Sequence, residues 1–245
     1  MKSENYRLLR KKSLYITSII GLTLITAAAI ILYLSGEFEQ NFPYATSLFF
    51  YMNVIDSKVL ILIVAFLFNM LLTGKDMFLT KHAVSFGVSR NMIFWTKLFL
   101  TLSYFLFLCL IGLLLMIGLG ENLLESEEQS IRNFLTASFN MLPIVLSGFF
   151  LIHMLKILRV GDVYIIVILL FFFVFSGDLL RMLLRPISAL EEMYRYAPSA
   201  LLSENSIKFM NLQAQFDYHY WVVGVVISVV SLLIGAKIFA RQNID

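Results

Sequence analysis

The sequence has little charge and a single cysteine. Charged residues make up 14% of its 245 positions, whereas a soluble domain carries about 25%. Hydrophobic residues make up 60%, and the mean hydropathy is +0.85. Because Cys109 has no second cysteine to pair with, an intrachain disulfide is excluded. These features predict an all-α integral membrane protein whose fold depends on helix packing within lipid.

The sequence also lacks the patterns that mark common catalytic and binding sites. It contains no G-x-x-x-x-G-K-[S/T] loop for a nucleotide phosphate. Its three histidines, His82, His153 and His219, lie in different segments without a metal-ligand neighbour at a useful spacing. We therefore predict no catalytic, cofactor or metal site on this chain, and no nucleic-acid partner.

Apolar runs long enough to cross a bilayer, roughly 17–25 residues, dominate the chain. The first is longer than the core of a signal peptide, so we interpret it as a retained span. The second is less regular, because the preceding SLFFYMNVI is an interfacial segment or an extension of the helix. We predict one transmembrane domain, residues 1–245, with spans at about Ser13–Leu34, Ser57–Leu72, Leu98–Leu119, Phe134–Leu155, Val163–Leu180 and Tyr220–Phe239.

The connecting segments differ in charge, which predicts the orientation. Thirteen of the 19 Lys and Arg residues and four of the 16 acids lie at the two termini and in the connections between spans two and three and between spans four and five, which gives a net charge of +9. The remaining connections carry six cations and 12 acids, a net charge of −6. By the positive-inside rule we expect a multi-pass protein of the cell membrane with both termini in the cytoplasm.

The segment between the fifth and sixth spans, from Gly177 to His219, is too apolar for a disordered loop. Pro186 and Pro198 interrupt helices, so we expect short broken helices that lean back into the outer leaflet. Arg181 and Arg185 are four residues apart, and therefore share one helical face. Together with Asp56 they lie near predicted span ends, which makes these three residues candidates for gating or structural elements of the outer half.

A cationic stretch, TGKDMFLTKHAVSFGVSRNMIFWTK from Thr73 to Lys97, separates the second and third spans. Its basic residues alternate with apolar ones such as Phe78 and Phe86, which is typical of a short amphipathic helix at a surface. Gly87 can end that helix in the left-handed conformation, and Ser89 can cap the next helix. The pattern predicts an elbow that faces the cytosol.

The elbow, the six spans, the long outer segment and the ending AKIFARQNID together resemble the permeases of ABC exporters of the type-two class. The resemblance covers nearly the whole chain. It implies a separate ATPase subunit that binds ATP and Mg, and a second permease copy or paralogue. The small size is similar to that of the branches for bacteriocin or lantibiotic immunity and peptide export. The residues that would couple to the ATPase are Lys75, Phe78, Lys81, Phe86, Gly87 and Arg90.

A second hypothesis is a membrane anchor or sensor subunit that transports nothing and binds a cytosolic partner through the same elbow. The two hypotheses predict the same fold and differ in whether binding is coupled to ATP hydrolysis. In both, membrane lipid surrounds the chain.

The charge distribution gives a direct test of topology. In a Cys109→Ser background, Glu125→Cys and Glu204→Cys should react with an impermeant thiol reagent added to whole cells, whereas His82→Cys should react only after permeabilisation. Labelling of His82→Cys in intact cells would contradict the orientation.

Overall fold

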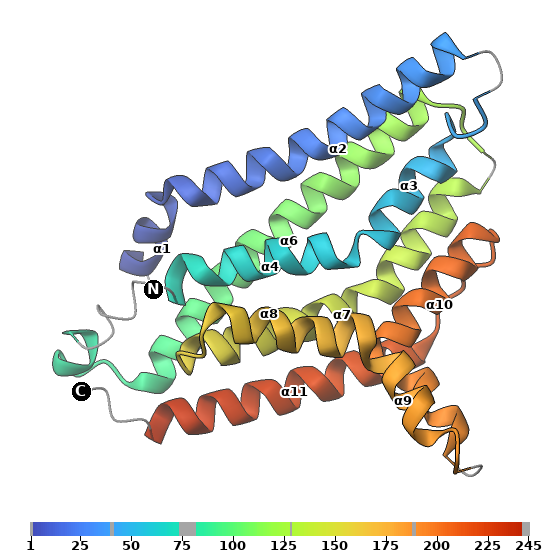
Figure 1. The fold of residues 1–245 in the computed structure, drawn as a ribbon. Helices are drawn as coiled ribbons and strands as arrows, with labels where there is room; N and C mark the ends of the chain where they lie inside the picture. The colour runs from blue at the N-terminus through green and yellow to red at the C-terminus, as the bar shows by residue number, and fades with distance from the viewer. Residues whose placement is uncertain (1, 40–41, 74–81, 128, 188–189, 242–245) are drawn as a thin grey trace.

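The computed structural model describes residues 2–39, 42–73, 82–127, 129–187 and 190–241, and these form helices and their connections (Figure 1). Within these ranges the β-type pairing is confined to one isolated bridge between Thr46 and Glu125. The helices are α1 (Lys2–Leu9), α2 (Lys12–Phe38), α3 (Ser47–Asp56), α4 (Lys58–Thr73), α6 (Arg90–Leu123), α7 (Ser130–Ile157), α8 (Asp162–Leu170), the π-helical η1 (Phe171–Phe175), α9 (Ser176–Leu184), the 3₁₀-helical η2 (Glu191–Tyr196), α10 (Pro198–Met210) and α11 (Tyr218–Arg241).

Five of these helical stretches in the described ranges are long and apolar enough to cross a membrane: α2, α6, α7, the continuous run from α8 to α9, and α11. The chain is thus an all-α membrane protein. The pair α3 and α4 passes the same length and hydropathy test only when taken together, with a 54° bend between them. Asp56, the last residue of α3, lies exposed at that bend. The apolar SLFFYMNVI is therefore a helix of its own that precedes α4.

The helices run between two ends of an elongated bundle (Figure 1). At one end lie α1, the last turns of α4, α7 and α11, and the first turn of α6; we call this the terminal end. The opposite end, the far end, holds the last turns of α2 and α6, the first turns of α3 and α7, and the helices α9 and α10.

Helix α7 lies at the centre of the bundle. In its most apolar stretch 61% of the residues are buried, against 28% or less in the other four candidate spans. Close backbone approach at glycines explains the burial, since Gly224 of α11 lies against Pro143 of α7 and Gly148 of α7 lies against Leu62 of α4. Small residues permit such approach between membrane helices, where van der Waals packing drives association.

The helix of the fifth predicted span extends beyond Leu180. It continues from Asp162 to Leu184 through η1, so Arg181 lies in its last turn and Arg185 follows as its C-cap. The two prolines act as expected: Pro186 follows the end of α9, and Pro198 is the first residue of α10, where its missing N–H costs nothing.

Asparagines of α7 hold the non-helical chain that leads from α10 to α11. Asn133 donates from Nδ2 to the carbonyl oxygen of Phe209 (2.7 Å) and accepts from the backbone N–H of Ala214 (2.9 Å). One heptad later, Asn140 donates to the Gln215 carbonyl (2.8 Å) and accepts from the Asp217 N–H (3.2 Å). The side chains of α7 thus fix the course of a connection whose own residues are mostly exposed.

Charged residues form ion pairs at the connection between α10 and α11. Lys208 of α10 lies 2.8 Å from Glu204 and 3.4 Å from Asp217. Partial burial acts to raise the pKa of Asp217, but hydrogen bonds from the backbone and ring of His219 and the charge of Lys208 outweigh it and lower that pKa. Asp217 is therefore ionised at neutral pH and serves as a fixed acceptor at the start of α11.

The contact between Gly224 and Pro143 predicts a stability difference. A Cβ atom at Gly224 would lie 2.5 Å from the carbonyl carbon and oxygen of Pro143, so Gly224→Ala should destabilise the bundle by about 1–3 kcal/mol through overpacking. The control is Gly21→Ala in α2, where a Cβ atom meets nothing within 4 Å. Thermal unfolding in detergent should show a lower midpoint for Gly224→Ala alone. Equal midpoints would contradict the packing described.

Candidate functional site

The candidate site is the elbow at the terminal end, between the end of α4 at Thr73 and the start of α6 at Arg90. Three of its predicted residues, Lys75, Phe78 and Lys81, fall within residues 74–81 and lie outside the described residues. Phe86, Gly87 and Arg90 are described, in a short helical turn at 82–85 and the chain that follows it.

Gly87 ends the short helical turn as predicted. Its φ angle is +84°, in the region that favours glycine. The N–H of Val88 donates to the Ala83 carbonyl (3.1 Å), and the N–H of Gly87 donates to the Val84 carbonyl (3.0 Å). This pair of bonds is the Schellman arrangement, which satisfies the last carbonyl groups of a helix. The predicted left-handed cap is confirmed.

Ser89 caps the start of α6, also as predicted. Its hydroxyl oxygen accepts from the backbone N–H of Met92 (3.3 Å), while its own backbone is extended. An extended residue whose side chain binds an N–H in the first turn is the usual N-cap. Two local signals, a glycine and a serine two residues apart, thus fix the direction in which the chain enters α6.

The apolar residues of the elbow lie on two sides. Ala83, Val84 and Val88 pack against the buried core of the bundle. Phe86 points the other way and is 86% exposed. We expected a single apolar side that faces a partner; in the described part, the aliphatic residues instead attach the elbow to its own bundle and leave the aromatic ring outside.

Two cations attach the elbow to neighbouring helices. Arg90 Nη1 donates to the carbonyl of Ala240 in the last turn of α11 (3.2 Å). Lys97 Nζ donates to the carbonyl of Leu72 in the last turn of α4 (2.7 Å), and Lys97 is only 1% exposed. Positive charge at a helix C-terminus is favourable, since it meets both the open carbonyl groups and the helix dipole. The start of α6, into which the elbow leads, is therefore fixed to both α11 and α4.

Asn69 and His153 join α4 to α7 beneath the elbow. The two residues are fully buried, and Asn69 Oδ1 lies 3.0 Å from His153 Nδ1. Asn69 Nδ2 donates to the carbonyls of Ala65 (3.0 Å) and Phe149 (3.4 Å). Because Oδ1 can only accept, Nδ1 of the histidine is the donor. The imidazole ring also lies edge-on to the ring of Phe94, with the two ring centroids 5.0 Å apart.

These contacts join the helices around the elbow. The start of α6 is bonded to α4 and α11, and α4 is bonded to α7 through Asn69 and His153. In the described ranges, no group of three His, Cys, Asp or Glu side chains could hold a metal ion.

The predicted far-end residues divide into two places. Arg181 and Arg185 line an open cavity of about 570 Å³ together with Asp178 and Met182. The guanidinium of Arg181 also lies 5.5 Å from the ring centroid of Tyr194 in η2. Asp56 does not line this cavity and lies at the bend between α3 and α4. The structure thus brings the two arginines together and leaves Asp56 apart.

Comparisons of the sequence with protein-family models and with curated proteins, and of the fold with solved structures, give no match.

Sequence reasoning missed Lys97 and the partnership of His153. Lys97 was assigned to the cytoplasmic connection, whereas it lies in the third turn of α6 and is buried. The N-cap at Ser89 starts α6 early enough to include Lys97, but it does not indicate that Lys97 is buried. His153 was given no partner, because its pairing with a residue 84 positions away leaves no local pattern.

A double-mutant cycle tests the buried pair. Asn69→Leu should destabilise the protein by about 1–3 kcal/mol, because His153 Nδ1 then loses its partner in an apolar core. Combining it with His153→Phe should recover part of that loss, since an apolar pair leaves nothing unsatisfied. The control is Asn53→Ala on α3, an exposed residue that donates to its own helix. Additive losses in unfolding experiments would show that the two side chains do not interact.

Proposed function

We propose that the chain is the permease subunit of an ABC exporter of the type-two class, driven by a separate ATPase. The observation that carries the proposal is the elbow. It is capped by Gly87 and Ser89, attached through Arg90 and Lys97 to α11 and α4, and presents Phe86 to the surroundings. A connection built only to carry positive charge needs neither the capped turn at Gly87 nor the two hydrogen bonds that attach the start of α6 to its neighbours.

In this mechanism the elbow is the coupling helix and sits in a groove of the ATPase. Phe78 and Phe86 enter the groove, Lys75, Lys81 and Arg90 meet acidic residues at its rim, and Gly87 maintains the bend. ATP and Mg bind to the ATPase, and closure of that subunit pushes on the elbow. The push reaches α4 through Lys97, α11 through Arg90, and α7 through Asn69 and His153.

The remaining features are assigned by the same proposal. The bent pair α3 and α4 counts as one span, which gives six, and the terminal end with both termini faces the cytoplasm. The helices η2 and α10 form a re-entrant segment in the outer leaflet. Arg181, Arg185 and Asp56 belong to the outer gate. Two permease copies, identical or paralogous, enclose a path for a hydrophobic or amphipathic substrate such as an antimicrobial peptide.

The test is whether an ATPase accompanies the chain and responds to substrate. The full chain, tagged and purified in mild detergent from its native membranes, should bring with it a second polypeptide that is labelled by 8-azido-ATP, while the 245-residue chain itself is not labelled. Hydrolysis by that complex should increase when amphipathic peptides are added. A co-purifying partner without nucleotide labelling would support the anchor or sensor function instead.

The exposed ring of Phe86 gives a matched test of coupling. Phe86→Ala should weaken association with the ATPase about 30-fold, as truncating an anchor that costs about 2 kcal/mol at an interface does. Phe38→Ala at the far end is the control, because Phe38 is also 86% exposed and its loss should leave association unchanged. Co-purification at graded detergent-washing stringency measures both. Equal retention of the ATPase by the two variants would exclude Phe86 as an anchor.

A further inference from the structure

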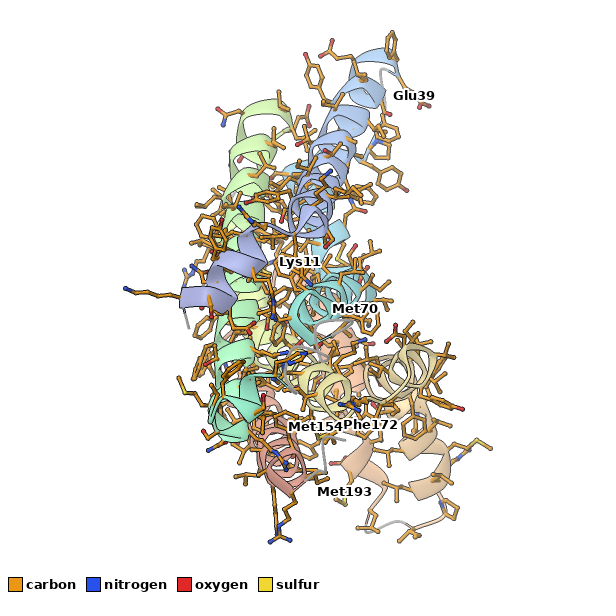
Figure 2. All side chains as sticks on the ribbon, turned by 90° about the vertical axis from the view of Figure 1, so that its left-hand side faces the viewer. Lys11, Glu39, Met70, Met154, Phe172 and Met193 are labelled. Atoms are coloured by element: carbon orange, nitrogen blue, oxygen red, sulfur yellow. The ribbon has the colours of Figure 1, made fainter. Side chains whose placement is uncertain are left out.

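Helix α1 is fixed against the terminal end of the bundle. Leu8 is fully buried in the core, and Asn5 Oδ1 accepts a hydrogen bond from Tyr104 Oη of α6 (3.0 Å). Tyr15 Oη of α2 donates to the carbonyl of Leu9 (2.9 Å), which holds the corner between α1 and α2. In Figure 1, α1 turns sharply away from α2, and Figure 2 places Lys11 at that corner. The outer face of α1 therefore has a defined position.

That outer face combines cations with apolar side chains. Lys2, Arg10 and Lys12 are exposed, and Tyr6 and Leu9 are 58% and 39% exposed. The guanidinium of Arg10 lies 4.5 Å from the ring centroid of Tyr6, so charge and aromatic surface are neighbours. We call these five residues the α1 face.

Among the residues that the structure describes, no acidic side chain forms an ion pair with Lys2, Arg10 or Lys12. Glu4 is the one acidic residue before Glu37 in the sequence, and its carboxylate lies 2.6 Å from Arg7. The first residues of α2 continue the apolar exposure, with Tyr15 at 50% and Ile16 at 54%. Positive charge thus lies directly beside the surface at which α2 enters its apolar span.

Water would solvate the cations but leave Tyr6 and Leu9 exposed to it. An apolar pocket on a protein would bury the rings and leave the cations unpaired. The boundary between headgroups and acyl chains meets both needs, because long basic side chains reach the phosphates while their neighbours enter the acyl layer. Anionic headgroups add an electrostatic attraction for each basic residue near the surface.

We infer that the α1 face is a docking surface for anionic lipid headgroups in the leaflet at the terminal end. Lys2, Arg10 and Lys12 bind the phosphates, and Tyr6 and Leu9 anchor the helix below them. This assignment does not rest on the proposed transport function, since an anchor subunit would carry the same surface.

Local lipid composition around α1 tests the inference. The full chain with Cys109→Ser and Ser3→Cys is labelled with bimane and placed in vesicles of phosphatidylcholine with about one third phosphatidylglycerol. Trace amounts of each lipid carry a spin label that quenches the fluorophore. We expect spin-labelled phosphatidylglycerol to quench several-fold more strongly than spin-labelled phosphatidylcholine at low salt, and the difference to shrink in about 1 M salt because of screening.

Two triple variants, each checked for monodispersity, separate the α1 face from general charge. Lys2→Gln, Arg10→Gln and Lys12→Gln together should bring the quenching ratio to about 1. Arg159→Gln, Lys237→Gln and Arg241→Gln remove the same charge from exposed residues at the same end and should leave the ratio unchanged.

Three outcomes would overturn the inference. Equal quenching by the two lipids in the unsubstituted α1 face, or an equal fall in both triple variants, would show that α1 has no headgroup preference of its own. Absence of quenching by either lipid would place the α1 face in water, where a soluble protein could cover it.

Discussion

Backbone groups that leave a helix inside an apolar bundle must find a polar partner in the protein, and this requirement organises the structure around α7. Each of its buried asparagines serves backbone of another segment: Asn133 and Asn140 bind the chain that leads into α11. In the opposite direction, Asn205 of α10 donates to the Ala137 carbonyl of α7 (2.9 Å). An unsatisfied group in hydrocarbon costs several kcal/mol, so these few contacts specify where α10 and α11 can lie.

The need of backbone carbonyl groups for a polar partner also explains how helices are joined at the terminal end. The last carbonyl groups of α4 and α11 face neighbouring helices, and the chain satisfies one on each with a cation, Lys97 and Arg90. Both cations belong to the first three turns of α6. The start of α6 therefore cannot shift alone, because a shift breaks bonds to two other helices.

Local sequence features predicted local structure well. Hydropathy predicted the long apolar helices, and Gly87 was correctly predicted as a left-handed residue. Ser89 predicted the start of α6, Pro186 the end of α9, and Pro198 the start of α10. Each of these features depends on residues a few positions apart, so the cause lies within one window of sequence. The predicted coupling role of the elbow is of another kind, since it concerns a partner.

Features set by contacts between distant segments were not predictable in the same way. The bend of 54° between α3 and α4 occurs where Asp56 and Lys58 interrupt an apolar run, which hydropathy interprets as the edge of a span. Ser176 and Gly177 of the fifth helix form hydrogen bonds with Ser199 of α10. Nothing within the run itself indicates that partner.

The buried Asn69 depends both on local sequence and on a contact with a distant segment. Asn69 joins α4 to α7 through the Phe149 carbonyl and His153. Its partner could not be predicted from the sequence, because an asparagine in an apolar run indicates only that another polar group lies near it. At the terminal end, that group belongs to α7. The helix that fixes the connection between α10 and α11 through Asn133 and Asn140 is thus also bonded to α4, the helix that leads into the elbow.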